Sequence, residues 1–125
     1  MLKLLLSLII LLTLSQAKNL HKERDYQEYF CKEFGGITEY RLKDKTRVDC
    51  LLDEYAIEVD FAKKWAESIG QSLFYANATS RKPAVLLIME NQQRDEKYLR
   101  RLESVSAKHH IDIWVINKDF EIYQK

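Results

Sequence analysis

The chain has 125 residues, of which 31% are charged and 46% hydrophobic, and its formal net charge is +1. This length suits one compact domain and is too short for two. The near-neutral charge excludes binding to nucleic acid through bulk charge, so that any such role depends on local basic patches.

Residues 1–17 have the pattern of a secretory signal peptide. Lys3 precedes an apolar run over residues 4–12, and residues 15–17, Ser-Gln-Ala, fit a small-residue cleavage site. The run is shorter than the roughly 20 residues that span a bilayer. We therefore expect residues 18–125 to form a single exported domain, periplasmic or secreted, without a stable membrane span. An uncleaved segment that anchors the N-terminus in the membrane is the alternative.

Residues 21–34 are expected to form the first helix, because Gly35 and Gly36 follow it as a stop signal. Glu23 lies on the expected inward face, although acidic residues near a helix start are also favoured by the helix dipole. The inward face contains Leu20, Glu23, Gln27, Phe30 and Phe34. Residues 37–42 are expected to form a strand that turns at residues 43–45.

Residues 48–52 and 55–61 are rich in β-branched and aromatic residues and predict a hairpin with a two-residue loop at Asp53-Glu54. This register places Cys50 opposite Ile57 and Val48 opposite Val59 on an apolar face. The other face carries Asp49 opposite Glu58, with Asp60 one step further along. Opposed like charges destabilise a strand pair, so the pattern indicates a divalent cation bound by carboxylates. A solvated acidic face without a ligand remains open.

Residues 62–77 are expected to form the second helix. Its apolar positions Trp65, Ile69, Leu73 and Ala76 recur at helical spacing. A second stripe on another face consists of Lys64, Ser68, Gln71 and Tyr75. Because this helix directly follows the acidic strand, the second stripe is placed to border the cation.

The remaining residues predict two further buried strands and a helix between them. Arg81-Lys82-Pro83 is expected to break the chain before an apolar strand at residues 84–89, which suits a parallel, doubly covered strand. Residues 95–108 form a charged helix with Tyr98, Leu102 and Val105 facing inward. Residues 111–116 form another buried strand, and residues 120–123 a short last one. The order α-β-β-β-α-β-α-β predicts an α/β fold with a mixed sheet flanked by helices.

Asp49, the Glu58-x-Asp60 motif and the helical Gln71 and Tyr75 together resemble the PD-(D/E)XK nuclease superfamily. The resemblance implies a restriction-endonuclease-like fold over residues 23–89. It further implies that Asp49 and Glu58 bind Mg2+ or Mn2+, that Asp60 and Glu23 are additional metal ligands, and that Gln71 orients water or a phosphate oxygen.

The chain departs from this family at Asp60, which stands where the family has a lysine. Lys64 shares a helical face with Gln71 and is the candidate for the displaced role of positioning or deprotonating water, with Lys63 behind it. We expect a metal-dependent endonuclease acting on DNA, with Lys63, Tyr75 and Arg47 contacting substrate. The alternative is an inactive exported module that binds protein or nucleic acid on the same fold.

The chain has two cysteines, Cys31 and Cys50. Export to an oxidising compartment favours a disulfide, and Cys31 near the end of the first helix can pack against the face that carries Cys50. Free buried cysteines are equally common, so the sequence leaves both states open.

Overall fold

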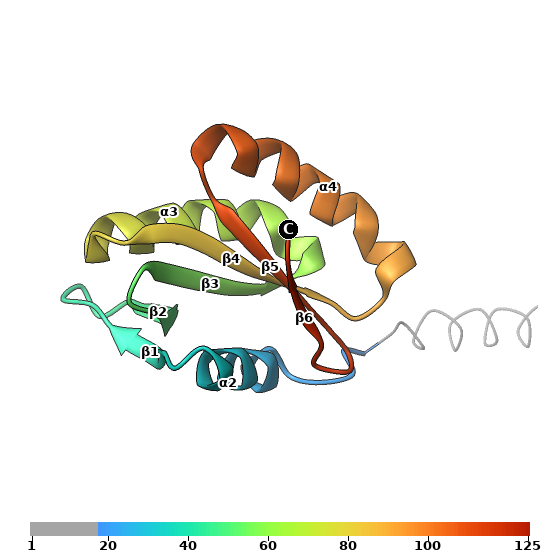
Figure 1. Ribbon diagram of the computed structural model, residues 1–125, viewed down its shortest axis with the longest axis horizontal. Helices are drawn as coiled ribbons and strands as arrows, with labels where there is room; N and C mark the ends of the chain where they lie inside the picture. Colours follow the sequence, from blue (N-terminus) through green and yellow to red (C-terminus); the bar gives the residue numbers. More distant parts are fainter. Residues whose placement is uncertain (1–17) are drawn as a thin grey trace, which may run out of the picture.

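The computed structural model describes residues 18–125, which form one six-stranded mixed sheet with helices on both faces (Figure 1). The expected signal peptide lies outside the described residues. Within residues 18–125, no helix is long and apolar enough to cross a membrane. The elements are, in chain order, α2 (Glu23–Glu33), β1 (Ile37–Arg41), β2 (Arg47–Leu51), β3 (Tyr55–Phe61), the short 3-10 helix η1 (Ala62–Lys64), α3 (Trp65–Thr79), β4 (Lys82–Met89), α4 (Gln92–His109), β5 (Asp112–Asn117) and β6 (Ile122–Gln124).

The strands lie side by side in chain order, from β1 to β6. β1, β2 and β3 form an antiparallel meander, whereas β4 is parallel to β3 and β5 is parallel to β4. Parallel neighbours need a crossover, and α3 and α4 supply the two crossovers. The predicted order of elements and the parallel setting of β4 are confirmed.

β4 begins two residues earlier than expected, at Lys82. Pro83 therefore lies inside the strand, although its ring removes a hydrogen-bond donor. The sheet accommodates this proline because β4 pairs with β5 only from Ala84 onward, opposite Asp112. Pro83 has a partner on one side alone, Ala56 of β3.

Alternate side chains of the central strands fill two apolar layers. Ala84, Leu86 and Ile88 of β4 pack with α2, through Tyr26 and Phe30, on one face of the sheet. Val85, Leu87 and Met89 pack with α4 and the start of α3 on the other face. In Figure 1, α2 accordingly lies below the sheet while α3 and α4 lie above it. The sheet is covered on both sides, which explains the unbroken apolar run of β4.

A disulfide joins Cys31 of α2 to Cys50 of β2, with the two Cα atoms 5.7 Å apart. The question that the sequence left open is thereby decided in favour of the bond. Gly36 passes directly over it, since a Cβ atom at this position would lie 2.8 Å from each sulfur. The bond fixes α2 beside the residue that follows Asp49.

The inward face of α3 differs from the predicted one. Leu73, expected in the core, is 38% exposed, whereas Ser68 and Ser72 are fully buried. Each serine hydroxyl donates to the carbonyl three residues earlier, so that neither buried hydroxyl lacks a partner. Small side chains let the helix pack closely against β3.

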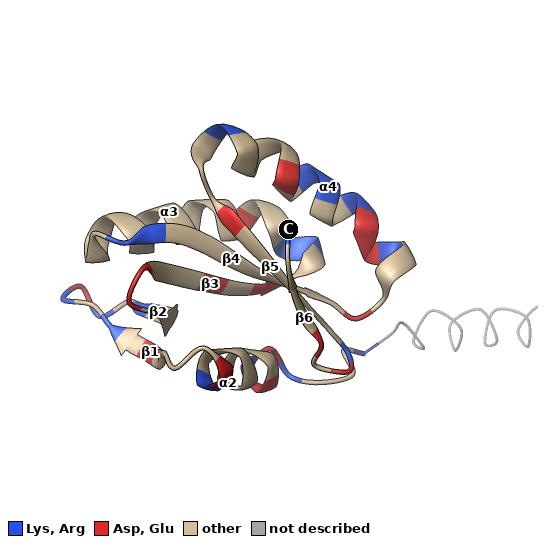
Figure 2. Ribbon diagram, viewed as in Figure 1, with Lys and Arg blue, Asp and Glu red and all other residues tan. Residues whose placement is uncertain are grey.

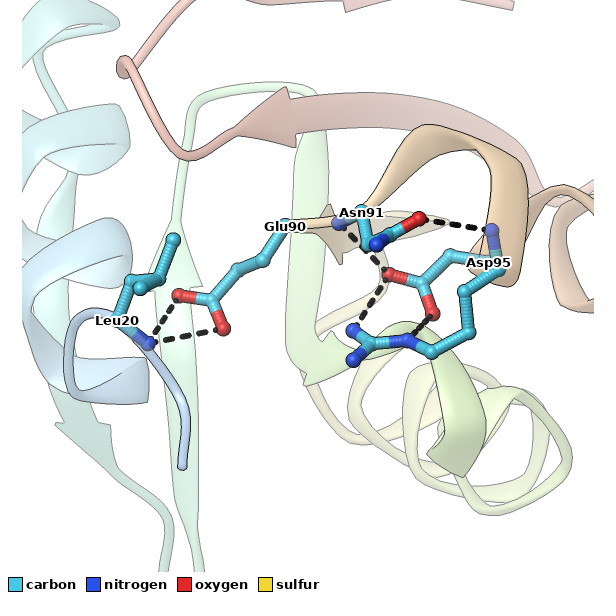
Figure 3. Close-up of polar contacts among 5 residues, drawn as sticks. Leu20, Glu90, Asn91 and Asp95 are labelled. Carbon is cyan, nitrogen blue, oxygen red and sulfur yellow. Dashed lines mark hydrogen bonds and ion pairs between the residues drawn. The ribbon is translucent and has the colours of Figure 1, made fainter. Parts of the chain in front are cut away.

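Carboxylates fix the chain on both sides of the loop that follows β4 (Figure 3). Glu90 accepts hydrogen bonds from the backbone N–H groups of Leu20 and His21 and from the Tyr26 hydroxyl. Leu20 was expected on the inward face of the first helix. It precedes α2, its side chain is 62% exposed, and only its backbone N–H is bonded, to Glu90. Asp95 accepts from the Asn91 N–H and from the Arg94 guanidinium.

Candidate active site

The pairing of β2 with β3 stops at Asp49. Leu52 N–H donates to Tyr55 O, and the predicted pair of Cys50 with Ile57 is formed. Because bonded pairs alternate along an antiparallel ladder, the Val59 N–H would next donate to the carbonyl of Val48. It donates instead to the Asp49 carboxylate, at 2.8 Å from Oδ2.

The backbone of Asp49 is also diverted from the sheet. Its carbonyl accepts from the Gln27 side-chain amide of α2, at 2.8 Å. As a result, the prediction that Val48 faces Val59 is wrong. Val48 belongs to a separate buried cluster with Leu51, Ala56 and Tyr75, next to α3. The interruption leaves the Asp49 side chain among the residues of β3.

Four carboxyl groups meet at this interruption: Glu23 of α2, Asp49 of β2, and Glu58 and Asp60 of β3. We call these residues the acidic cluster. Glu58 interacts with both Asp49 and Asp60, and Asp60 also interacts with Glu23. The groups thus adjoin one another in the order Glu23, Asp60, Glu58, Asp49. Figure 2 shows acidic positions on β3 and α2.

The two carboxyls of β3 are the most deeply buried members of the acidic cluster. Glu58 is 3% exposed and Asp60 is 5% exposed. Among residues 18–125, no donor reaches Glu58 Oε2 or Asp60 Oδ2. Buried polar atoms nearly always have a hydrogen-bond partner, so these two oxygens indicate a place for a ligand or for shared protons.

Burial and mutual repulsion hold protons on the acidic cluster. Burial, followed by the charges of Asp49 and Asp60, raises the pKa of Glu58 to about 11. Burial likewise raises the pKa of Asp49 to about 6, against the opposing Val59 N–H, and that of Glu23 to about 7. The pKa of Asp60 is also raised, mainly by burial. A cation that binds here would displace protons.

Lys64, at the end of η1, is the nearby cation. Its charge lowers the pKa of both Glu23 and Asp60 against the larger effect of burial. The side chain is exposed and has no ion pair within 4 Å in the part of the chain that the structure describes. Lys64, the predicted replacement for the family's strand lysine, is therefore near Asp60. Within the described residues, it forms no ion pair with another carboxylate.

Gln71 and Tyr75 border the acidic cluster from α3. Tyr75 is 8% exposed, and burial together with the charges of Glu58, Asp49 and Asp60 raises its pKa. Its hydroxyl donates to Gln71 Oε1 at 3.1 Å. Since the amide oxygen is engaged, the Gln71 NH2 group is the part that remains for a ligand.

A cleft of about 700 Å³ opens at Glu23, the one member of the acidic cluster that lines it. Its lining includes Glu23, Lys63, Lys64 and Arg94. Arg47, a predicted substrate contact, is exposed at the start of β2 and does not line this cleft. Arg94 was not anticipated from the sequence, because the helix was expected to begin at Asp95, whereas α4 begins at Gln92.

The residues of the acidic cluster suit a hard divalent cation. Mg2+ prefers oxygen ligands and often takes only one or two carboxylates, with water completing its shell. Within residues 18–125, no three or more His, Cys, Asp or Glu residues are already arranged as a metal-binding group. The adjoining pair Asp49 and Glu58, with its unpartnered oxygen, is sufficient for a site of the water-rich kind.

Two further residues shape the site that sequence reasoning did not assign to it. Gln27, one helical turn after Glu23, holds the Asp49 backbone, and its place on the same helix face was the available signal. Glu39 of β1 has a positive φ of 54° and adds negative charge near Asp49 and Tyr75.

A scan against models of protein families, a search of curated proteins and a search of solved structures each find no match.

Proposed function

We propose that the protein is a metal-dependent phosphodiester hydrolase, an endonuclease that acts on DNA. The observation that carries the proposal is the Glu58 carboxyl, 3% exposed and with an oxygen that no donor reaches, in contact with Asp49 and Asp60. A burial of this kind costs stability unless a ligand offsets it. Tyr75, which holds Gln71, is next to Glu58, and Lys64 is near Asp60 and Glu23, as the proposed chemistry requires.

Asp49 and Glu58 would hold Mg2+ or Mn2+, with Asp60 and Glu23 as the adjoining carboxylates. The bound cation would polarise the phosphate and stabilise the developing charge. Lys64 would position the attacking water and hold or release its proton. Gln71 would direct its NH2 group at water or a phosphate oxygen, because Tyr75 already engages its carbonyl oxygen. Lys63 and Arg94 line the cleft where phosphates would approach.

The order α2-β1-β2-β3-α3-β4 agrees with the αβββαβ core of the restriction-endonuclease-like fold. We propose this fold for the chain, with α4, β5 and β6 as additions to it. Support comes from the position of Asp49 and Glu58 on paired strands and of Gln71 and Tyr75 on the following helix. Export through the N-terminal segment is part of the same proposal, and the disulfide agrees with an oxidising compartment.

One observation favours a second candidate function, an inactive module that binds nucleic acid or protein. Asp60 stands where the resembling family has its lysine, so β3 itself supplies a carboxyl at this position, next to Glu23 and Glu58, and no cation. In that case the acidic cluster would bind a cation for stability alone. Activity measurements separate the two functions.

The test is nicking of supercoiled plasmid by the full-length protein in mild detergent, with Mg2+, with Mn2+ or with EDTA. We expect nicking that depends on metal, that is lost in Glu58→Ala and that is reduced in Lys64→Ala. The controls are Glu103→Gln, a half-exposed carboxylate on α4 that pairs with Lys125, and Lys108→Ala, an exposed cation on the same helix. Both controls should nick at the rate of the unchanged protein.

Folded protein that shows no cleavage of DNA or RNA above the EDTA background would exclude the catalytic function. Normal activity in Lys64→Ala together with loss in Lys63→Ala would transfer the water-positioning role to Lys63. Nicking that persists in Glu58→Ala would remove the acidic cluster from the mechanism.

A further inference from the structure

A second depression lies between the β1–β2 hairpin and the C-terminal half of α3, and we call it the hairpin groove. Its volume is about 520 Å³. Two aromatic residues, Tyr40 and Phe74, and three cations, Arg41, Lys43 and Arg81, line it. The resemblance to the nuclease superfamily does not explain why aromatic and basic residues lie together here, and none of these residues has a role in the proposed catalysis.

The aromatic rings of the hairpin groove face solvent. Phe74 is 45% exposed and Tyr40 is 40% exposed. Phe74 has an aromatic neighbour in Tyr75, with ring centroids 5.8 Å apart and tilted by 56°, which leaves its other face uncovered by an aromatic ring. Exposed aromatic rings in a concave site often mark a binding surface.

The charge of the hairpin groove is positive. Asp44 is the one acidic residue that lines it, and its carboxylate accepts hydrogen bonds from the N–H and hydroxyl of Thr46. Arg81 is held in place by a hydrogen bond from Nε to the Asp53 carbonyl. Arg47 pairs with Arg41 across the hairpin, and Figure 2 shows basic positions on it. The partner that complements this surface is a polyanion with planar groups.

The hairpin groove adjoins the acidic cluster through α3. Phe74 precedes Tyr75 in the chain, and Tyr75 faces Glu58 and Asp49. Leu42, on the floor of the groove, packs in the same cluster as Tyr75. The hairpin groove and the acidic cluster therefore both lie next to Tyr75.

We propose that the hairpin groove binds an unpaired strand of nucleic acid, with bases stacked on Phe74 and Tyr40 and with phosphates against Arg41, Lys43 and Arg81. Bases inside a duplex are stacked on one another and offer no free face to these rings, whereas unpaired bases do. The proposal rests on the proposed function in one respect, namely that the bound strand leads to the phosphodiester at the acidic cluster. It makes single-stranded or locally unpaired nucleic acid the substrate class.

Binding is measured by fluorescence anisotropy with the full-length protein and a labelled oligothymidylate of about 12 nucleotides, a length in the range that one such groove covers. The measurement uses EDTA, so that neither metal binding nor cleavage contributes. We expect Phe74→Ala to weaken binding about tenfold, as loss of one stacked base does. Phe34→Ala is the matched control, because Phe34 is also 45% exposed but lies at the end of α2. Both residues are exposed, and circular dichroism confirms that the variants are folded.

The cations are tested by salt dependence. Lys43→Ala should flatten the slope of log affinity against log salt by about 0.7, the value for one phosphate of a single strand. Phe74→Ala should leave this slope unchanged, because stacking releases no counterions. Lys97→Ala, an exposed cation on α4, is the control and should leave both slope and affinity unchanged.

A duplex of the same length should bind more weakly than the single strand, and oligouridylate should bind as well as oligothymidylate, because the groove contacts base faces and phosphates. Equal binding of the duplex and the single strand, or equal affinity of Phe74→Ala and Phe34→Ala, would overturn the proposal. Strong single-strand binding without metal-dependent cleavage would support the groove and exclude the nuclease. Metal-dependent cleavage unaffected by Phe74→Ala and Lys43→Ala would overturn the groove alone.

Discussion

Two carboxylic acids are buried to the same degree in this protein but in opposite surroundings. Asp95 at the start of α4 and Glu58 in β3 are each 3% exposed. Asp95 accepts two hydrogen bonds from the Arg94 guanidinium and one from the Asn91 N–H (Figure 3). Glu58 has an unpartnered oxygen and carboxyls on two sides. The buried carboxylate of Asp95 is therefore stabilised by hydrogen bonds within the protein. The equally buried carboxyl of Glu58 requires a proton or a ligand.

The largest expected difference between the two acids is in activity. Glu58→Gln preserves the size of the side chain but removes its charge, and we expect it to reduce metal-dependent nicking by about 100-fold or more, since it removes a direct metal ligand. Asp95→Asn should reduce nicking per folded molecule much less, because Asp95 holds Arg94 at the cleft but contacts none of the acidic cluster. The measurement is the initial nicking rate, normalised to the folded fraction. Equal loss in both variants would contradict the distinction.

Stability should show the reverse order. Asp95→Ala leaves the Asn91 N–H without its partner and removes the carboxylate from the Arg94 pair, and we expect a loss of about 2 kcal/mol in the free energy of unfolding. Arg94 can turn to solvent, which limits the loss. Glu58→Gln should leave the metal-free protein about as stable as before, because the raised pKa of Glu58 keeps its carboxyl protonated and the amide is likewise neutral. Urea unfolding in EDTA measures both variants, and a large loss in Glu58→Gln would contradict this expectation.

Added Mg2+ should stabilise the Asp95→Ala protein but not the Glu58→Gln protein. It should therefore narrow the difference between their free energies of unfolding. A ligand that binds only the folded state stabilises it by mass action, by about 1.4 kcal/mol at a concentration ten times its Kd. We expect the unfolding midpoint of the unchanged protein to rise with Mg2+, and Asp49→Asn to erase the rise. Asp53→Asn, in the exposed loop between β2 and β3, is the control that should respond normally. A midpoint independent of Mg2+ and Mn2+ would argue against a cation at the acidic cluster.

The last expectation concerns the effect of pH on the stability of the metal-free protein. The pKa of Glu23 is raised to about 7 and that of Asp49 to about 6, so the folded state holds protons that the unfolded state has already lost. Stability is therefore full below the ordinary carboxyl pKa and decreases as pH rises through about 4 to 7, by less than about 1.4 kcal/mol per unit for each proton. Unfolding in EDTA at a series of pH values tests the sign. Glu23→Gln combined with Asp49→Asn should flatten the curve, whereas a rise in stability over this range would contradict the expectation.

The sequence predicted the order of the elements, because each strand or helix has its own periodicity and stop signals. It also predicted the register at Cys50 and Ile57, because loop length alone determines that pairing. It did not predict the end of the pairing at Asp49, where a side-chain carboxylate replaces a backbone carbonyl as acceptor. The Asp49 carboxylate can take this place partly because Gln27, 22 positions earlier in the chain, binds the Asp49 carbonyl.

The sequence predicted the four carboxyl residues of the acidic cluster, but not the inward face of α3 or the hairpin groove. Glu23, Asp49, Glu58 and Asp60 do adjoin one another, as the alternation of β3 and the helix faces suggested. The inward face of α3 was misjudged, because hydropathy ranks Leu73 above Ser68 and Ser72, whereas close packing favours small side chains with satisfied hydroxyls. The hairpin groove joins residues of β1 and α3 that are some 30 positions apart, which no local pattern reveals.

Gly36 and the disulfide beneath it make two distant sequence changes interdependent. A methyl group at position 36 would lie 2.8 Å from both sulfurs and 2.5 Å from the Leu52 side chain, which is flexible enough to turn away. The Gly36→Ala substitution is thus harmful while Cys31 and Cys50 are joined and much milder once both are alanine. This interdependence favours one order of sequence change, in which the cysteines are replaced before position 36 acquires a side chain.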